Sequence, residues 1–134
     1  MVDADELQQL AVDIAREAGA LARRRRDDGV RIAATKSALA DIVTEADREV
    51  EQLIRDRLAR ARPDDGFLGE ESGAERGTSG VTWVVDPIDG TVNYAYGIPH
   101  YAVSIAAVSG EPTPEAWTAE TGVVYTPVVD ELFH

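Results

Sequence analysis

The stretch Trp83-Val84-Val85-Asp86-Pro87-Ile88-Asp89-Gly90-Thr91 places two acidic residues at the end of an apolar run. The first part of the stretch is β-branched and aromatic, which predicts a buried strand. Because proline cannot continue a hydrogen-bonded ladder, Pro87 should interrupt that strand. We therefore expect the carboxylates of Asp86 and Asp89 to converge at one strand end, with the Ile88 carbonyl between them.

Oxygen ligands in such an arrangement suit a hard divalent cation. Gly90 and Thr91 are also expected to open a helical turn, whose free N–H groups would face an anion. A cation beside an anion is the arrangement that phosphate chemistry requires. The same residues are compatible with an acidic surface turn, so this stretch alone leaves both a metal site and a structural turn open.

Two further acidic stretches lie upstream of the predicted strand. Gly69-Glu70-Glu71-Ser72-Gly73 follows a short apolar run and offers either a further metal ligand or an ordinary acidic loop. Asp41-Ile42-Val43-Thr44-Glu45-Ala46-Asp47 offers Asp47 either as a site residue or as part of a capping box, with Thr44 as the N-cap. Local sequence favours the loop and the capping box.

Apolar residues at spacings of three and four predict helices over residues 3–26 and 46–61. The first helix should stop at Asp27-Asp28-Gly29 and lead into a weak strand over Val30–Thr35. The polar, glycine-rich residues 73–80 should form a loop. β-Branched and aromatic runs predict strands at 81–85, 101–108, 116–125 and 128–133. Two helices followed by a strand-rich half predict an α+β layered domain.

The composition excludes several functions. The chain has 134 residues, with 25 acidic and 13 basic residues and a net charge of −12. This charge argues against binding to nucleic acid or anionic membranes, which needs a basic surface. Apolar residues make up 44%, too many for a disordered acidic tail. No secretory signal or membrane-length apolar run is present, so we expect a cytoplasmic protein.

Some catalytic sites are excluded by residues that the chain lacks. It has no cysteine, so a disulfide framework, a cysteine zinc site and a thiol nucleophile are ruled out. His100 and His134 are its only histidines, which excludes a histidine-rich zinc site. We interpret His100 as a structural or rim residue. The arginines at 23–26 are interpreted as a solvated helix end rather than an interaction patch.

Taken together, in this order and spacing, the three acidic stretches resemble the inositol monophosphatase family of magnesium-dependent phosphatases. The residues that carry the resemblance are the lone lysine Lys36, Asp41–Asp47, Gly69-Glu70-Glu71-Ser72, and Trp83–Thr91 with its continuation Val92-Asn93-Tyr94. Residues 97–105 and 122–125 also look like this family. The resemblance therefore covers the chain from about residue 5 to its end and favours a functional role for each motif.

The resemblance implies Mg²⁺ as the cofactor, with two or three ions. Glu70, Asp86, the Ile88 carbonyl and Asp89 would be metal ligands. Glu71 would support an outer ion through water. These oxygen donors are the ligand type that Mg²⁺ prefers.

The resemblance also implies how the substrate is held. Gly90 and Thr91 would bind the phosphate through backbone N–H groups and the Thr91 hydroxyl. Asp47 and Thr91 would orient and help to deprotonate the attacking water, and Lys36 would be a nearby counter-charge. The implied reaction is hydrolysis of a phosphate monoester by metal-activated water, with release of phosphate and an alcohol.

The implied fold is a layered αβαβα sandwich of the sugar-phosphatase type, of which this chain covers the N-terminal helices and antiparallel sheet. We expect residues 1–134 to be the N-terminal portion of a phosphatase domain, with two helices before a strand-rich metal-binding segment and with the C-terminal half absent. That half would supply a further metal ligand and the groups that recognise the hydroxyl groups of the substrate. The resemblance also implies a homodimer.

Inositol monophosphate is the substrate favoured by the residues that follow Gly90. A related sugar phosphate or histidinol phosphate is the alternative. A rival from another class is a truncated, non-catalytic chain that binds metal or associates with a partner chain through its exposed last strand.

Overall fold

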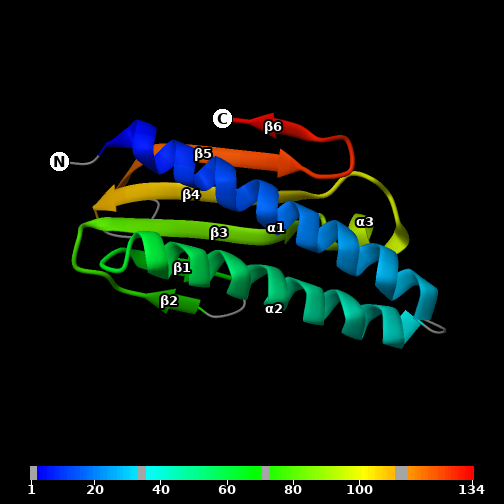
Figure 1. Ribbon diagram of the computed structural model, residues 1–134. Helices are drawn as coiled ribbons and strands as arrows, with labels where there is room; N and C mark the ends of the chain where they lie inside the picture. The colour runs from blue at the N-terminus through cyan, green and yellow to red at the C-terminus, as the bar shows by residue number, and fades with distance from the viewer. Residues whose placement is uncertain (1–2, 33–35, 71–72, 111–114) are drawn as a thin grey trace.

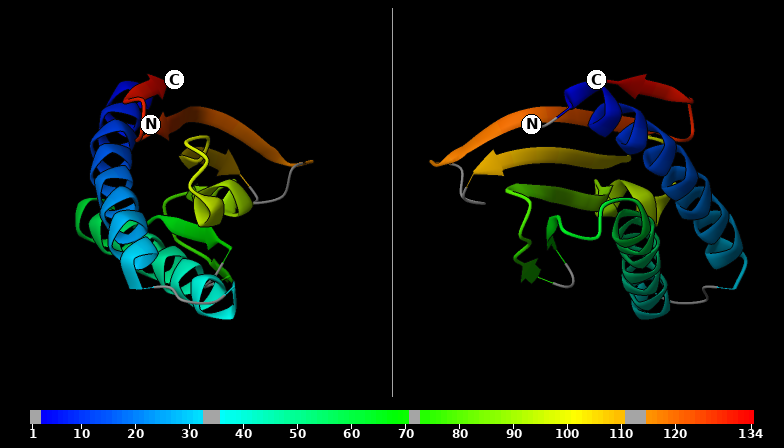
Figure 2. Two further views of the ribbon diagram at one scale, coloured as in Figure 1. Left: turned by 90° about the vertical axis from the view of Figure 1, so that its right-hand side faces the viewer. Right: turned by 60° about the vertical axis from the view of Figure 1, so that its left-hand side comes forward.

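The computed structural model describes residues 3–32, 36–70, 73–110 and 115–134. Two long helices, α1 (Ala4–Ile32) and α2 (Lys36–Ala61), lie on one face of a six-stranded sheet (Figure 1). α1 packs over the β4 and β5 side of the sheet, and α2 packs over β3. Figure 2 shows both helices on the same side of the twisted sheet, which makes a two-layer α+β arrangement.

The sheet has the spatial order β2-β1-β3-β4-β5-β6. Its strands are β1 (Gly66–Gly69), β2 (Gly73–Glu75), β3 (Val81–Asp89), β4 (Ala102–Gly110), β5 (Trp117–Thr126) and β6 (Glu131–Phe133). A short helix, α3 (Thr91–Tyr96), follows β3. β1 and β3 are parallel and the other pairs are antiparallel, so the sheet is mixed rather than antiparallel as expected.

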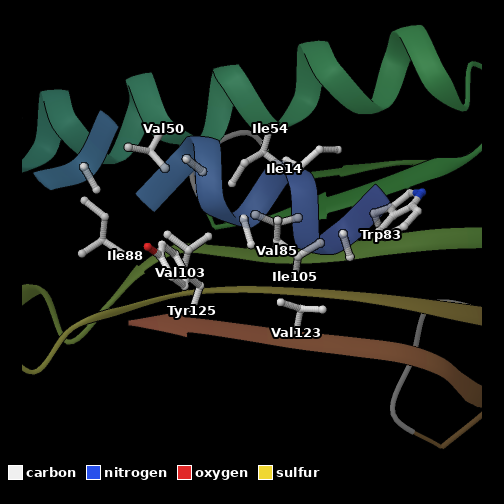
Figure 3. Packing of buried hydrophobic residues seen from close by; sticks show 14 of the residues in the cluster. Ile14, Val50, Ile54, Trp83, Val85, Ile88, Val103, Ile105, Val123 and Tyr125 are labelled. Carbon is white, nitrogen blue, oxygen red and sulfur yellow. The ribbon is translucent and has the colours of Figure 1, made fainter. Parts of the chain in front are cut away.

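The core lies between the helices and the sheet (Figure 3). Val85, Ile105 and Val123 are paired across β3, β4 and β5, and each is at most 3% exposed. Ile14 of α1 and Ile54 of α2 pack against the same core and are fully buried. Burial of each aliphatic side chain contributes about 1.5–3 kcal/mol to stability. The row of Val85, Ile105 and Val123 therefore fixes which face of the strands turns inward.

The first helix continues beyond the predicted stop. α1 runs through Asp27-Asp28-Gly29 to Ile32, so the helix end at residue 26 and the strand over residues 30–32 are wrong, and residues 33–35 lie outside the described residues. A Cβ at position 29 would lie 2.5 Å from Ile42 Cγ2 of α2. The glycine therefore permits close packing of the two helices, and this tertiary contact outweighs its low helix propensity.

The second helix begins earlier than predicted, at Lys36. Thr44 is not its N-cap, because its hydroxyl donates to the Ala40 carbonyl at 3.0 Å within the helix. Asp47 is likewise a helix-interior residue, only 7% exposed, and does not belong to a capping box. Burial of one helix face against the sheet extends the helix past its local start signal.

The predicted strands over 81–85, 101–108 and 116–125 are confirmed within a few residues. Part of the predicted 73–80 loop is β2, which pairs with β1. The last strand is shorter than predicted, because Asp130 adopts a φ of 52° in the turn before β6. Within the described ranges, no helix combines the length and apolar character that a membrane span requires.

The arginines at the end of the predicted first helix do more than face solvent. Arg25 pairs with Glu49 of α2, its Nε donating at 2.5 Å. Arg26 Nε donates to the Tyr94 carbonyl of α3 at 2.5 Å. The Tyr94 hydroxyl donates in turn to the Ala22 carbonyl at 2.8 Å. α1 therefore holds both α2 and α3.

A buried carboxylate anchors the start of β1. The side chain of Asp65 is 2% exposed. It accepts hydrogen bonds from Arg62 Nε at 2.7 Å, Ser79 Oγ at 2.6 Å and Trp83 Nε1 at 2.8 Å. The contact ties the end of α2 to the first residues of β3.

Candidate functional site

The end of β3 carries the two carboxylates of the central motif. Asp86 pairs with Ser104 and Asp89 pairs with Ala102, so β3 has one more residue than β4 between the pairs. Residues two apart on a strand share a face, as do directly paired residues. Asp86 and Asp89 are three positions apart and would point to opposite faces in a regular strand. The extra residue of the β-bulge at Pro87 therefore turns both carboxylates to one face of the sheet.

The parallel pairing of β1 and β3 delivers a third acidic residue to the same edge. Gly69 is paired with Val85, and Glu70 and Asp86 are the next residues of their chains. The Glu70 carboxylate lies close enough to Asp86 for its charge to raise the pKa of Asp86. Two stretches that are 16 positions apart in sequence therefore meet because their strands end together.

Burial and like charges raise the pKa of Asp86 to about 6. Desolvation is the largest cause, followed by the charges of Glu70 and Asp89. A hydrogen bond from the Ile88 backbone acts in the opposite direction. Asp86 Oδ1 is buried and has no hydrogen-bond partner among the described residues. A cation at this position would relieve both the repulsion and the unpaired oxygen.

The chemistry of these donors fits Mg²⁺. The set is made of carboxylate oxygens, and one of them is a buried oxygen without a partner. Even so, in the part of the chain that the structure describes, no three acidic or histidine side chains gather closely enough to hold one ion. Glu70 and Asp86 form the tight pair, Asp89 is exposed beside them, and Glu71 lies outside the described residues.

Gly90 and Thr91 open α3, as the helical-turn interpretation requires. Gly90 has a φ of 87°, and a Cβ there would lie 3.0 Å from the His100 carbonyl. Among the described residues, no side chain caps the N-terminus of the helix. Asn93 Nδ2 donates to the same His100 carbonyl at 2.9 Å, so the following loop is held against α3.

Asp47 and Thr91 line one cavity of about 330 Å³ between α2 and α3. Its other walls are mostly apolar and include Val43, Val92 and Tyr96. Asp47 therefore lies beside the α3 start although it is far away in sequence. Both residues to which the family resemblance gives a role toward the attacking water line this common space.

A larger cavity of about 610 Å³ lies between α1 and α2 and contains none of the predicted site residues. Lys36 is the first residue of α2, and its side chain lies outside the described residues. The structure thus gathers the predicted site at the ends of β1 and β3 and at the α3 start. Glu71 and the Lys36 side chain are not placed.

Sequence reasoning missed Glu51, a 2% exposed carboxylate one helical turn after Asp47. Its position four residues after Asp47, on the apolar face of a predicted helix, was the available signal. A charged residue is seldom found fully buried without a specific role.

Comparison with known proteins gives a consistent result. A family model described as the inositol monophosphatase family matches residues 3–134. The inositol-1-monophosphatase of Mycobacterium bovis is 47% identical over 118 residues, which is 78% of this chain and 41% of that protein. The structure of Mycobacterium tuberculosis SuhB is similar with a TM-score of 0.74 and 41% identity, covering 95% of this chain and 42% of that chain.

A structure of SaIMPase-II with inositol monophosphate bound has a TM-score of 0.69 and 30% identity. The match covers 94% of this chain and 42% of that chain. This chain thus spans less than half the length of the relatives that it matches. The similarity extends over nearly all of the α1–β6 unit.

Proposed function

The chain belongs to the inositol monophosphatase family, and on that premise we propose that the complete protein hydrolyses inositol monophosphate in a Mg²⁺-dependent reaction. The observation that carries the proposal is Asp86, whose buried oxygen lacks a partner and whose carboxylate lies against Glu70. Such a pair is unfavourable without a cation. The inositol monophosphate bound to SaIMPase-II supports the choice of substrate.

Glu70, Asp86, Asp89 and the Ile88 carbonyl would hold the metal, with Glu71 supporting an outer ion. When bound, Mg²⁺ supplies neutralisation of the phosphate charge and lowers the pKa of water. The proposed set includes two or three ions, as the family resemblance implies.

The residues at the α3 start would bind the phosphate group. The backbone N–H groups of Gly90 and Thr91, together with the Thr91 hydroxyl, donate to its oxygens. Asp47, across the same cavity, accepts a proton from the attacking water. The water oxygen keeps one hydrogen and forms the new bond to phosphorus as the ester P–O bond breaks. The proton accepted by Asp47 returns through solvent to the leaving oxygen, so the products are hydrogen phosphate and the alcohol. Lys36 would balance the negative charge of the site.

The test is phosphate release by the complete protein from a panel that includes inositol monophosphate, fructose 1,6-bisphosphate and histidinol phosphate. We expect inositol monophosphate to be hydrolysed fastest, with activity lost in EDTA and restored by Mg²⁺. Preference for histidinol phosphate would refute the inositol assignment. Activity that is unchanged in EDTA would refute the metal assignment.

Asp89→Asn should abolish most activity while the protein stays folded, because the residue is exposed at the strand end. Glu49→Gln is the matched control, since Glu49 pairs with Arg25 of α1 and is not among the proposed site residues. Near-normal turnover by Asp89→Asn would contradict the ligand assignment. We expect little turnover from residues 1–134 alone, because a further ligand is expected from outside them.

A homodimer is also part of the proposal and rests on the family resemblance, whereas the cytoplasmic location is a prediction from the sequence. Light scattering on the complete protein would measure its mass. A monomeric mass at assay concentration would refute the dimer without affecting the catalytic assignment.

A further inference from the structure

Glu51 of α2 is a buried carboxylate with no role in the proposed chemistry. It is 2% exposed, which makes it more buried than Asp47 one turn earlier on the same helix. Residues four apart on a helix share a face, so both side chains point toward the sheet. Arg55, a further turn along, has its guanidinium 4.4 Å from the centre of the Phe67 ring.

The carboxylate of Glu51 lies directly against Gly69, the last residue of β1. A Cβ at position 69 would come within 2.7 Å of Glu51 Cδ, closer than real Cβ atoms approach other atoms. The contact exists only because position 69 is glycine. Glu51 and the ring of Phe67, whose Cε1 would also lie 2.7 Å from that Cβ, therefore fill the space that a side chain at position 69 would otherwise occupy.

Gly69 immediately precedes Glu70. It is paired with Val85 of β3 on one side and with Gly73 of β2 on the other. A displacement of Gly69 would therefore move Glu70 relative to Asp86, the residue after Val85. The contact with Glu51 fixes this strand end from the helix layer, while the ladder fixes it within the sheet.

We propose that Glu51 is a positioning residue, which holds the end of β1 so that Glu70 meets Asp86 at the metal site. The inference rests on the proposed function for the identity of the metal. The contact by which Glu51 holds the end of β1 does not depend on a metal. Glu51 acts through the backbone of Gly69 rather than as a ligand. Partners that orient metal ligands typically contribute 10- to 100-fold in metal affinity.

The experiment measures Mg²⁺ binding to the complete protein by calorimetry, without substrate. We expect Glu51→Ala to weaken the affinity by about 10- to 100-fold. Glu51→Gln keeps the volume against Gly69 and should retain most of the affinity. Gly69→Ala should also weaken binding, because its new methyl group would push against the carboxylate.

The double variant Glu51→Ala with Gly69→Ala tests the contact itself. If the two residues act through each other, Gly69→Ala should cause less loss once the carboxylate has been removed than it causes alone. The remaining loss would come from Phe67 Cε1, 2.7 Å from the new Cβ. Fully additive losses would overturn the proposal. Glu49→Ala is the matched control from the same helix, and its affinity should equal that of the wild type.

Hydrogen exchange on the metal-free protein gives a readout that is independent of the metal. We expect faster exchange in Glu51→Ala in peptides that cover residues 66–70, with α1 unchanged. If Glu51→Gln loses as much affinity as Glu51→Ala, then Glu51 is a ligand and the positioning role is refuted. A lower melting temperature with unchanged affinity and exchange would also refute it.

Failure of the proposed function gives a different result. If the wild type does not bind Mg²⁺, the metal assignment fails for both proposals. Faster exchange at residues 66–70 in Glu51→Ala would then still support the positioning of β1. Unchanged exchange would overturn it.

Discussion

Asp65→Ala removes the buried carboxylate that ties α2 to β1 and β3, and we expect a large loss of stability. Trp83 is 1% exposed, and its indole N–H would lose its acceptor, which costs about 1–3 kcal/mol. Arg62 has a side chain that is 34% exposed, so its lost bonds are partly replaced by water. Together these effects give about 3–4 kcal/mol, within the range for breaking a buried ion pair.

Asp65→Asn removes the charge of the side chain and keeps its shape, so it separates the two contributions to stability. The amide oxygen can still accept from Trp83, but the charge-assisted pair with Arg62 is lost. We expect about half the loss caused by Asp65→Ala. The assay is urea unfolding of the complete protein, followed by tryptophan fluorescence and circular dichroism with a common slope.

The control for this series is Asp64→Ala. Its side chain is exposed, and the hydrogen bonds from Thr78 and Ser79 are accepted by its backbone carbonyl, which the substitution keeps. We expect a change within about 0.5 kcal/mol. A loss below about 1 kcal/mol for Asp65→Ala would refute the reasoning, as would a larger loss for Asp65→Asn than for Asp65→Ala.

Three further predictions concern the helices and the site. Gly19→Ala should lower the free energy of unfolding, measured in urea, by about 1–3 kcal/mol. The new Cβ would lie 2.5 Å from the Tyr125 ring, and this overpacking exceeds the gain of about 1 kcal/mol in helix propensity. In metal-free protein, protonated Asp86 stabilises the fold below pH 3.8, and this contribution is lost as the pH rises through its folded pKa of about 6. Thermal melts in EDTA should therefore show Asp86→Asn more stable than the wild type above pH 6 and no more stable near pH 4; the reverse trend would contradict the pKa shift. Arg26→Ala should speed hydrogen exchange in residues 91–97, since it removes the bond to the Tyr94 carbonyl, and unchanged exchange would show that α1 does not hold α3.

The strands and the order of the motifs could be predicted from the sequence because local signals and tertiary structure agree there. The run from Val81 to Val85 is β-branched and aromatic, and four of its five residues are buried. The motif after it interrupts the ladder between Asp86 and Asp89, where Pro87 lacks an N–H, and pairing with β4 resumes at Asp89. For such segments, the hydrophobic pattern and the backbone chemistry point to the same structure.

The helix ends could not be predicted because packing outweighs local propensity. Gly29 looks like a helix stop, but its lack of a side chain lets α1 approach Ile42 of α2. Thr44 and Asp47 have the spacing of a capping box, yet both lie inside α2. A capping signal is worth about 1 kcal/mol, which is less than the burial of one more apolar turn.

The candidate site was only partly visible for a different reason. Acidic residues can be recognised in the sequence, but Glu70 and Asp86 meet only through the register of β1 with β3. Glu51 and Asp65 gave weaker signals, because burial of a carboxylate depends on partners distant in sequence. The sequence identifies the acidic residues that could bind a metal. The fold determines which of them lie close to one another.

The parallel pairing of β1 with β3 has a consequence for how the chain can change in length during evolution. A deletion of one residue within Gly66–Gly69 would turn Glu70 to the opposite face of the sheet, because side chains alternate along a strand. The same holds for Val81–Val85 and Asp86. In the connection between the strands, adding or removing one residue does not turn Glu70 or Asp86 to the other face of the sheet. We therefore expect insertions and deletions to be tolerated in parts of the crossover and selected against within the two strands.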